Sequence, residues 1–387
     1  MTPTPAISGT AAPGFEAVRE AFADNFTRDG DYQEVGAALA VFHAGRCVAD
    51  LWDGHADKAK TRPWMRDSLV NVWSATKAAT AVAVAVLIDR GAIAYEDNVA
   101  SVWPAFAQSG KGDVTLAQVM SHQAGLPGFA EPTTLEDQYD WADCVAKLAR
   151  QAPVWAPGEA TSYHAMTYGW LAGEVVRRVA GKSVGAVLRE EIAGPLGADI
   201  FIGLAADLEP RVAELIGPRR EPDPGPIAAL PPAALMALTN PTQSPAAANT
   251  RAWRAAEIPA ANGHASAMGL ARLYAALVGG GALEGKRILS SEGVARLTAP
   301  ATGSGRKDMF LGFVDCWAMG VALNTPGLYG PNPRAYGHSG WGGSFGCADP
   351  DLKVAIGYVC NQMGPELVGD PRTGPLCVAA LEAAARA

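Results

Sequence analysis

The sequence has little charge and no excess of basic residues. Only 18% of its 387 residues are charged, and 39 acidic residues against 31 basic ones give a formal charge of −8. Proteins that bind nucleic acid or an anionic membrane carry basic surfaces, so we expect neither partner here. Hydrophobic residues make up 49% of the chain, which is enough for a sizeable core and too much for a disordered segment.

The sequence also lacks paired cysteines, an export signal and long apolar runs. None of its six cysteines forms a Cys-x-x-Cys pair, so we expect reduced thiols rather than a zinc ribbon or a redox site. Residues 1–14 contain no basic residue and no apolar run, unlike a signal peptide. The apolar stretch 78–88 is too short to span a bilayer. These features predict a cytoplasmic protein.

Strand-like segments occur near both ends of the chain. Residues 35–43 and 47–52 are apolar runs on either side of Ala44-Gly45-Arg46, a pattern that predicts a β-hairpin. Near the C-terminus we expect further strands, and we expect a helix close to each end. These strands span 315–323, 344–348 and 354–360, and these helices span 15–26 and 375–387.

This arrangement predicts two structural domains. We expect an α/β (α+β) domain with one antiparallel sheet built from both termini, residues 1–95 and 311–387. A mostly helical domain, residues 96–310, would be inserted into it. Residues 217–250 are rich in proline and alanine, and we expect an ordered excursion or flap there because helical patterns flank it.

Ser74 and Lys77 are the first candidates for chemistry. They precede residues 78–90, which are apolar at almost every position, and a helix that is apolar all round is a buried helix. Residues three apart share one helical face. Burial lowers the pKa of a lysine, so that it can act as the base that a serine nucleophile needs. The alternative is a serine helix cap beside a lysine that reaches solvent.

Two other serines fit short motifs but are weaker candidates. Ser304 and Lys307 repeat the Ser-x-x-Lys spacing in a polar, glycine-flanked turn, which we interpret as a solvated loop. Ser344 lies in Gly-x-Ser-x-Gly, the nucleophile-elbow pattern. That triad runs Ser, acid, His along the chain, and the last histidine, His338, precedes Ser344. Ser344 is therefore not expected to be a nucleophile.

Two further motifs complete a known set. Tyr163-His164-Ala165 and His338-Ser339-Gly340, together with Ser74 and Lys77, resemble in order and spacing the signature elements of serine β-lactamases and penicillin-binding proteins: Ser-x-x-Lys, Tyr-x-Asn and Lys-Thr-Gly. The spacing is similar to that of the class C branch. Residues 114–127, 169–181 and 261–277 add local resemblance, so that it covers nearly the whole chain.

The departures from the motifs point to one branch of the superfamily. Ala165 replaces an asparagine that would help hold the side-chain amide of a β-lactam, and His338 replaces a lysine that would pair with its carboxylate. Trp341 adds bulk beside that strand. These variants resemble family VIII carboxylesterases, which share the β-lactamase fold and mainly cleave esters.

The resemblance implies an antiparallel sheet flanked by helices, a helical domain, and an active site between them. It implies cleavage of a small-molecule, short-chain carboxylic ester through an acyl-enzyme on Ser74, with weak β-lactam hydrolysis. Lys77 and Tyr163 would form a coupled general base, and the backbone N–H groups of Ser74 and Trp341 would form the oxyanion hole. The residues expected to contact the substrate are His338, Ser339, Gly340, Trp341, Ala165 and Phe129. No metal or other cofactor is required, because no residue spacing suggests a metal site.

Three other functions stay open at this point. A β-lactamase or D-alanyl peptidase is disfavoured by Ala165, by His338 and by the expected location. An acyltransferase or amidase on the same fold is not separated from an esterase by sequence. A non-catalytic ligand-binding module is disfavoured because Ser74, Lys77 and Tyr163 are all present. The remaining histidines, His122 and His264 among them, are expected to be structural.

Overall fold

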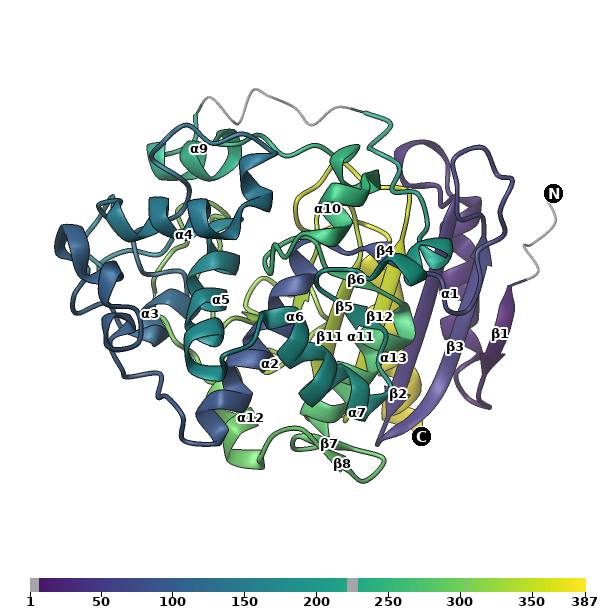
Figure 1. Cartoon of the computed structure of the whole chain (residues 1–387). Coiled ribbons are helices and arrows are strands. Elements are labelled where there is room, and N and C mark those ends of the chain that lie inside the picture. The colour runs from purple at the N-terminus through teal and green to yellow at the C-terminus, as the bar shows by residue number, and fades with distance from the viewer. Residues whose placement is uncertain (1–6, 221–228, 304) are drawn as a thin grey trace.

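The computed structural model describes residues 7–220, 229–303 and 305–387. A seven-stranded sheet lies at one side of the molecule and a mostly helical region at the other (Figure 1). The expected mixed α/β architecture is therefore confirmed. The division at residues 95 and 311 stays a prediction.

The large sheet is built from both ends of the chain. Its order is β1-β3-β2-β12-β11-β10-β9, and every neighbouring pair is antiparallel. β2 and β12 lie side by side at its centre, with Leu39 opposite Tyr358. The strands are β1 (Ser8–Ala11), β2 (Gly36–His43), β3 (Arg46–Gly54), β9 (Ala322–Leu323), β10 (Tyr336–Ser339), β11 (Phe345–Asp349) and β12 (Val354–Cys360).

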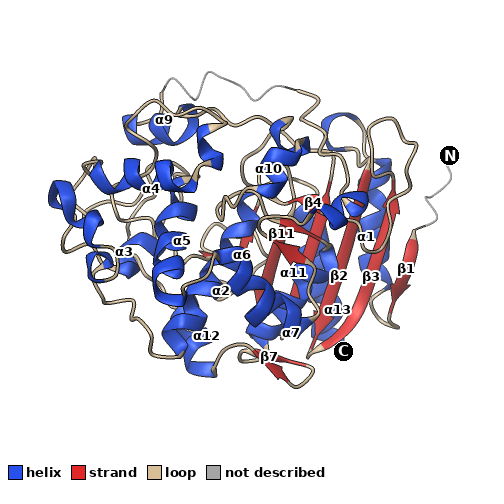
Figure 2. Ribbon diagram, in the orientation of Figure 1, coloured by secondary structure: helices blue, strands red, loops and turns tan. Residues whose placement is uncertain are grey.

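Helices cover both faces of this sheet, as Figure 2 shows for α1, α13 and α11. The helices are α1 (Glu16–Thr27), α2 (Thr76–Asp89), α3 (Leu116–Met120), α4 (Trp141–Arg150), α5 (Thr167–Ala180), α6 (Val184–Val187), α7 (Gly194–Leu196), α9 (Pro232–Thr239), α10 (Arg251–Ala255), α11 (Ala267–Val278), α12 (Ser291–Thr298) and α13 (Thr373–Arg386). Short strands pair as β4 (Val70–Asn71), β6 (His264–Ala265) and β5 (Ile200–Phe201), and as β7 (Ala282–Leu283) with β8 (Lys286–Arg287).

The expected hairpin forms at β2 and β3. Ala44 and Gly45 both have positive φ, 48° and 79°, as a tight two-residue hairpin turn requires. β2 is apolar throughout because both of its faces are buried. Leu39 and its neighbours two residues away pack under α1 and α13, while Ala40 and Phe42 face α11. A strand covered on both faces reads as a continuous apolar run.

α2 is the buried helix expected from the sequence. Every residue from Thr76 to Ile88 is buried, and the helix packs against α5 and α12. Because it is enclosed on all sides, α2 holds its first turn, with Lys77, at a fixed place against strand β10.

The strand predicted over 315–323 is wrong, since only Ala322–Leu323 is a strand. Asp315 has positive φ (51°), and tight turns occupy the segment before Ala322.

The proline-rich excursion is described only in part, because residues 221–228 lie outside the described residues. Beyond them, Asn240 donates to the carbonyls of Phe129 and Glu131, both at 2.7 Å, so this part is anchored.

No helix in the described residues has the length and hydropathy of a membrane span.

Candidate active site

Ser74 lies in a short 3-10 turn, Trp73–Ala75, directly before α2. Trp73 has φ of 45°, a left-handed conformation that is uncommon for a bulky residue. The turn is tied down because the Thr76 hydroxyl donates to Trp73 O and accepts from Gly263 N at 2.8 Å. The Ser74 side chain is half-buried and lines a cavity. The backbone therefore holds Ser74 at the N-terminal end of the buried helix α2.

Lys77 is fully buried one turn later. Its Nζ lies 3.1 Å from Ser74 Oγ and donates to Ala165 O at 2.7 Å and to Ala260 O at 2.9 Å. Burial lowers the pKa of Lys77 well below its ordinary value. A neutral amine has two N–H groups and one lone pair. With both N–H groups on the two carbonyls, the lone pair faces Ser74 Oγ.

Tyr163 packs beside this pair. Lys77 Nζ lies 4.7 Å from the centroid of the Tyr163 ring. The Trp317 ring stacks on the Tyr163 ring, with the two centroids 5.3 Å apart. Burial raises the pKa of Tyr163, although hydrogen bonding with Ser74 lowers it in part. Burial thus favours the neutral forms of both Lys77 and Tyr163.

Asp308 fixes the position of Tyr163 from behind. This carboxylate is 1% exposed. Its Oδ1 accepts from the backbone N–H groups of Phe310 (2.9 Å), Leu311 (2.8 Å) and Tyr163 (3.3 Å), and its Oδ2 accepts from the Trp317 indole at 2.8 Å. Burial raises the pKa of Asp308, and these hydrogen bonds lower it in part. One carboxylate therefore ties the Tyr163 backbone to the ring that stacks on Tyr163.

His338 faces this group from strand β10. Its ring centroid lies 6.2 Å from that of Tyr163 and 6.0 Å from that of Trp317. Burial lowers the pKa of His338 to about 3. Its Nδ1 donates to Ser339 O at 2.9 Å. Nε2 therefore carries the lone pair, and no partner for Nε2 occurs among the described residues.

Gly340 and Trp341 follow directly on β10. A Cβ on Gly340 would lie 2.1 Å from Val72 O, so only glycine allows this close approach to the segment before Ser74. The Trp341 ring packs on Trp73 at 5.2 Å. Within the described part of the chain, the Trp341 backbone N–H donates to no acceptor. This amide is free to donate to a bound oxyanion.

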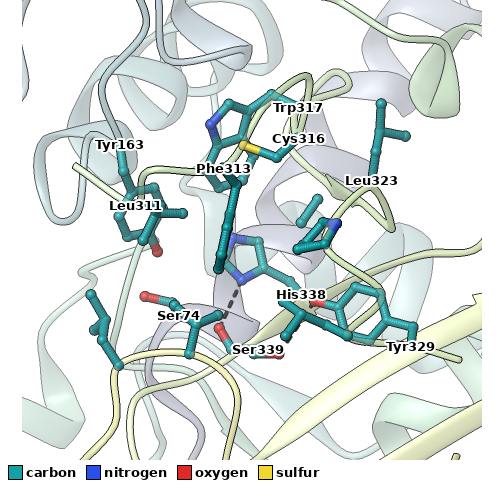
Figure 3. A pocket seen from close by; sticks show the side chains of 15 residues that line it. Ser74, Tyr163, Leu311, Phe313, Cys316, Trp317, Leu323, Tyr329, His338 and Ser339 are labelled. Atoms are coloured by element: carbon teal, nitrogen blue, oxygen red, sulfur yellow. Dashed lines mark hydrogen bonds between the residues drawn. The ribbon is translucent and has the colours of Figure 1, made fainter. Parts of the chain in front are cut away.

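A narrow cavity of about 30 Å³ opens beside Ser74 (Figure 3). Its polar lining comes from Ser74, Tyr163, His338, Ser339 and Tyr329, and no lysine or arginine lines it. Tyr329 and Ser339 hydroxyls interact at 3.3 Å. The apolar walls are Leu311, Phe313, Cys316, Trp317, Ala322, Leu323, Pro326, Leu328, Leu367 and Val368.

Two buried histidines support Tyr163 from below. The His122 ring lies 5.1 Å from Tyr163 and edge-on to Trp317 at 4.2 Å, and its Nδ1 accepts from His164 N. Burial lowers the pKa of His122 well below its ordinary value and that of His164 to about 4. Both rings are neutral packing groups, although His122 lies closer to the site than sequence reasoning placed it.

The structure brings most, but not all, of the expected residues together. Ser74, Lys77, Tyr163, Ala165 and the segment from His338 to Trp341 converge; Ala165 contributes its carbonyl to Lys77. Of the residues expected to contact the substrate, His338 and Ser339 line the cavity, whereas Ala165, Gly340, Trp341 and Phe129 do not. Phe129 is 1% exposed and packs on Trp170 at 5.4 Å.

The competing serines are placed differently. Ser344 is 4% exposed, and its hydroxyl accepts from Cys360 N at 3.2 Å. This buried, hydrogen-bonded side chain agrees with the interpretation that Ser344 is not a nucleophile. Ser304 lies outside the described residues.

Sequence reasoning missed Asp308 and most of the apolar wall. The signal for Asp308 was a lone acidic residue before the apolar stretch 309–313. The described residues contain no cluster of three or more potential metal ligands among His, Cys, Asp and Glu.

The chain is similar to known proteins over most of its length. The family model described as Beta-lactamase matches residues 20–374. The chain is 38% identical over 383 residues to the esterase/beta-lactamase LipL of Mycobacterium tuberculosis, covering 95% of this chain and 86% of LipL.

Two solved structures are similar along their whole length. A family VIII carboxylesterase shares 45% identity with a TM-score of 0.91, and 98% of this chain covers 100% of that one. A penicillin-binding protein homologue from Caulobacter crescentus shares 41% identity with a TM-score of 0.88, at the same coverage.

Proposed function

Because the chain belongs to the beta-lactamase family and is a serine carboxylesterase on that fold, we propose that it hydrolyses short-chain carboxylic esters through an acyl-enzyme on Ser74. The observation that carries the proposal is the fully buried Lys77 amine, 3.1 Å from Ser74 Oγ, with both of its other contacts to backbone carbonyls.

In the first step, the Ser74 hydroxyl gives its proton to the neutral Lys77 amine while Oγ bonds to the ester carbonyl carbon. The carbonyl oxygen becomes an oxyanion, which the backbone N–H groups of Ser74 and Trp341 stabilise. One such donor is typically worth about 3 kcal/mol in the transition state. The geometry that supports this role is the close approach of Gly340 to Val72.

Collapse of the intermediate breaks the bond to the alcohol. Tyr163, a neutral phenol, donates its proton to the leaving alkoxide and regains one from Lys77, so the pair returns to its starting state. In deacylation, a water molecule attacks the acyl carbonyl and its proton passes through Tyr163 to Lys77. The bond between the acyl carbon and Ser74 Oγ then breaks, and Lys77 gives its extra proton to Ser74 Oγ as the acid leaves.

Cavity size and charge support a short, neutral substrate. A cavity of about 30 Å³ holds roughly two water-sized groups, which matches a short acyl chain. A β-lactam brings a carboxylate. Here His338 is neutral and presents a lone pair from Nε2, so it offers that carboxylate no cation. LipL, an esterase/beta-lactamase by name, is consistent with weak β-lactam hydrolysis alongside the main activity.

The test is a panel of p-nitrophenyl esters of increasing acyl length beside a chromogenic cephalosporin. We expect kcat/KM for the short esters to exceed that for the cephalosporin by at least ~10²-fold, which corresponds to about 2.7 kcal/mol. Equal turnover would favour a β-lactamase instead. Added acceptor alcohols separate hydrolysis from acyl transfer, because a transferase would yield new esters in place of the free acid.

A further inference from the structure

A fully buried arginine contacts the turn that carries Trp341. Arg372 lies directly before α13, and its side chain has no exposed surface. An arginine presents five N–H donors in a rigid fork, and here all five have acceptors at 2.6–2.9 Å. These acceptors are the carboxylates of Asp370 and Glu34 and the carbonyls of Gln362 and Gly342. The guanidinium is therefore fixed on every side.

The Gly342 carbonyl belongs to a tight turn between β10 and β11. Gly343 N donates to Gly340 O at 3.3 Å, which closes residues 340–343 into a four-residue turn. Gly343 has φ of 117°, and a Cβ on it would lie 2.6 Å from Arg372 Nη2. Glycine at this position thus lets the guanidinium reach the turn, where Nη2 donates to Gly342 O at 2.7 Å.

Two peptide units connect the guanidinium to the expected oxyanion donor. The first unit contains Gly342 O and Gly343 N–H, and the second contains Gly340 O and Trp341 N–H. Both units are trans, and the C=O and N–H of a trans peptide point in opposite directions. Arg372 binds the oxygen of the first unit, and the N–H of that unit binds the oxygen of the second. The place of the guanidinium therefore determines where the Trp341 N–H points.

The charge on Arg372 adds to this geometry. Hydrogen bonds from an ionised donor are stronger than those between neutral groups, and hydrogen bonds in a chain polarise one another. The cation thus strengthens the Trp341 N–H as a donor to an oxyanion, whose charge develops only during the reaction. Because Glu34 and Asp370 offset part of the charge, we expect orientation to contribute more than polarisation.

We propose that Arg372 is a positioning residue of the oxyanion hole, which holds the turn 340–343 through Gly342 O and so aims the Trp341 N–H at the oxyanion. The proposal rests on the ester hydrolysis proposed above. It adds a residue that does not line the cavity beside Ser74 and acts on the reaction only through the backbone.

The experiment compares Arg372→Lys with the native enzyme on p-nitrophenyl butanoate and on a trifluoromethyl ketone of the same acyl length. Such a ketone forms a tetrahedral adduct with a serine nucleophile, and the oxyanion of the adduct occupies the oxyanion hole. Lysine keeps a cation but loses the fork that holds the turn and the carboxylates together. We expect kcat to fall by about 10-fold, KM to change little, and the inhibition constant of the ketone to rise by a similar factor, because the donor is turned rather than lost.

A second variant covers the case in which Arg372→Lys does not fold. Arg372→Met combined with Asp370→Asn removes both members of a buried ion pair, which is better tolerated than the loss of one member. Circular dichroism confirms that each variant is folded. The double variant should show the same parallel loss of kcat and of ketone affinity.

Lys111→Met is the matched control for a buried cation bonded to backbone carbonyls. Lys111 has no exposed surface and donates to the carbonyls of Gln108, Ala149 and Gln151. None of these residues lines the cavity beside Ser74. The variant should lower Tm and leave kcat and ketone affinity unchanged.

The outcomes separate this proposal from the proposed function. Native ester hydrolysis with unchanged kcat and ketone affinity in the folded Arg372 variants would overturn the positioning role and leave the esterase intact. An equal loss in Lys111→Met would also overturn it, because the loss would then follow from destabilisation in general. Absence of any ester hydrolysis by the native enzyme would contradict the proposed function itself.

Discussion

The rings of Trp317 and Tyr163 are stacked, with centroids 5.3 Å apart and planes only 7° from parallel. The indole N–H of Trp317 donates to Asp308 Oδ2, and Asp308 Oδ1 accepts from the Tyr163 backbone. Tyr163 is thus held through its ring and its backbone by one buried carboxylate. The phenol hydroxyl at the end of this held ring points toward Ser74 (Figure 3).

Breaking this support should slow catalysis without blocking substrate binding. Trp317→Phe keeps an aromatic ring but removes the N–H that anchors it, and Asp308→Asn places an amide donor among N–H donors. We expect each to lower kcat by about 10-fold and to change KM little, since a misplaced general acid or base costs rate in the transition state. Steady-state kinetics on a butanoate ester measure both. Trp103→Phe, at another fully buried tryptophan, is the control and should reduce stability alone; a kcat loss of the same size there would remove the positioning role.

Lys77 and Tyr163 should act as one proton-transfer unit. Lys77→Ala and Tyr163→Phe are each expected to lower kcat by at least ~10²-fold, and the double variant should be little worse than the poorer single one, because groups that act together give non-additive losses. Single-turnover kinetics on the same ester give the three values. Losses that multiply in full would indicate two independent roles.

The pH dependence of substrate choice tests the state of His338. Its folded pKa of about 3 lies below the ordinary value, so as pH falls the side chain stays neutral until well below the working range. From about pH 8 down to about pH 5, the ratio of kcat/KM for a cephalosporin to that for a butanoate ester should stay constant, although an ordinary histidine would become cationic near 6.5. A ratio that climbs as pH falls through 6.5 would show that His338 gains a proton and attracts the carboxylate. His338→Lys should raise the ratio at all of these pH values.

The oxyanion donor should depend on Gly340. Gly340→Ala puts a Cβ 2.1 Å from Val72 O, so the two backbone segments must separate and the Trp341 N–H moves away from Ser74. We expect kcat to fall by roughly 10²-fold, in line with the loss of one oxyanion-hole donor. Gly374→Ala, where an added Cβ meets nothing within 4 Å, should leave kcat unchanged. Retained activity in Gly340→Ala would mean that the Trp341 amide does not serve the oxyanion.

The sequence predicted the parts of the fold that local pattern determines. β2, β3 and β12 are long apolar runs with clear breaks, and α2 is apolar on every face, so their extents were close to the observed ones. The segment over 315–323 looked the same but folds mainly as turns. Its side chains are committed to the pocket: the Trp317 indole donates to Asp308 rather than packing in a sheet.

The site was predictable only where it rests on short motifs. Ser74, Lys77 and Tyr163 carry such motifs and converge. Asp308 could not be identified, because its link to the site depends on Tyr163, 145 residues away, whose backbone N–H it accepts.

The identity of the nucleophile is the central claim, and covalent labelling tests it most directly. The native enzyme would be treated with a fluorophosphonate, and the adduct located by mass spectrometry of its peptides. The account predicts one adduct, on Ser74, that is lost in Ser74→Ala and retained in Ser344→Ala, because Ser344 is buried and its hydroxyl is bonded to Cys360 N. An adduct on Ser344, or labelling that persists in Ser74→Ala, would contradict it.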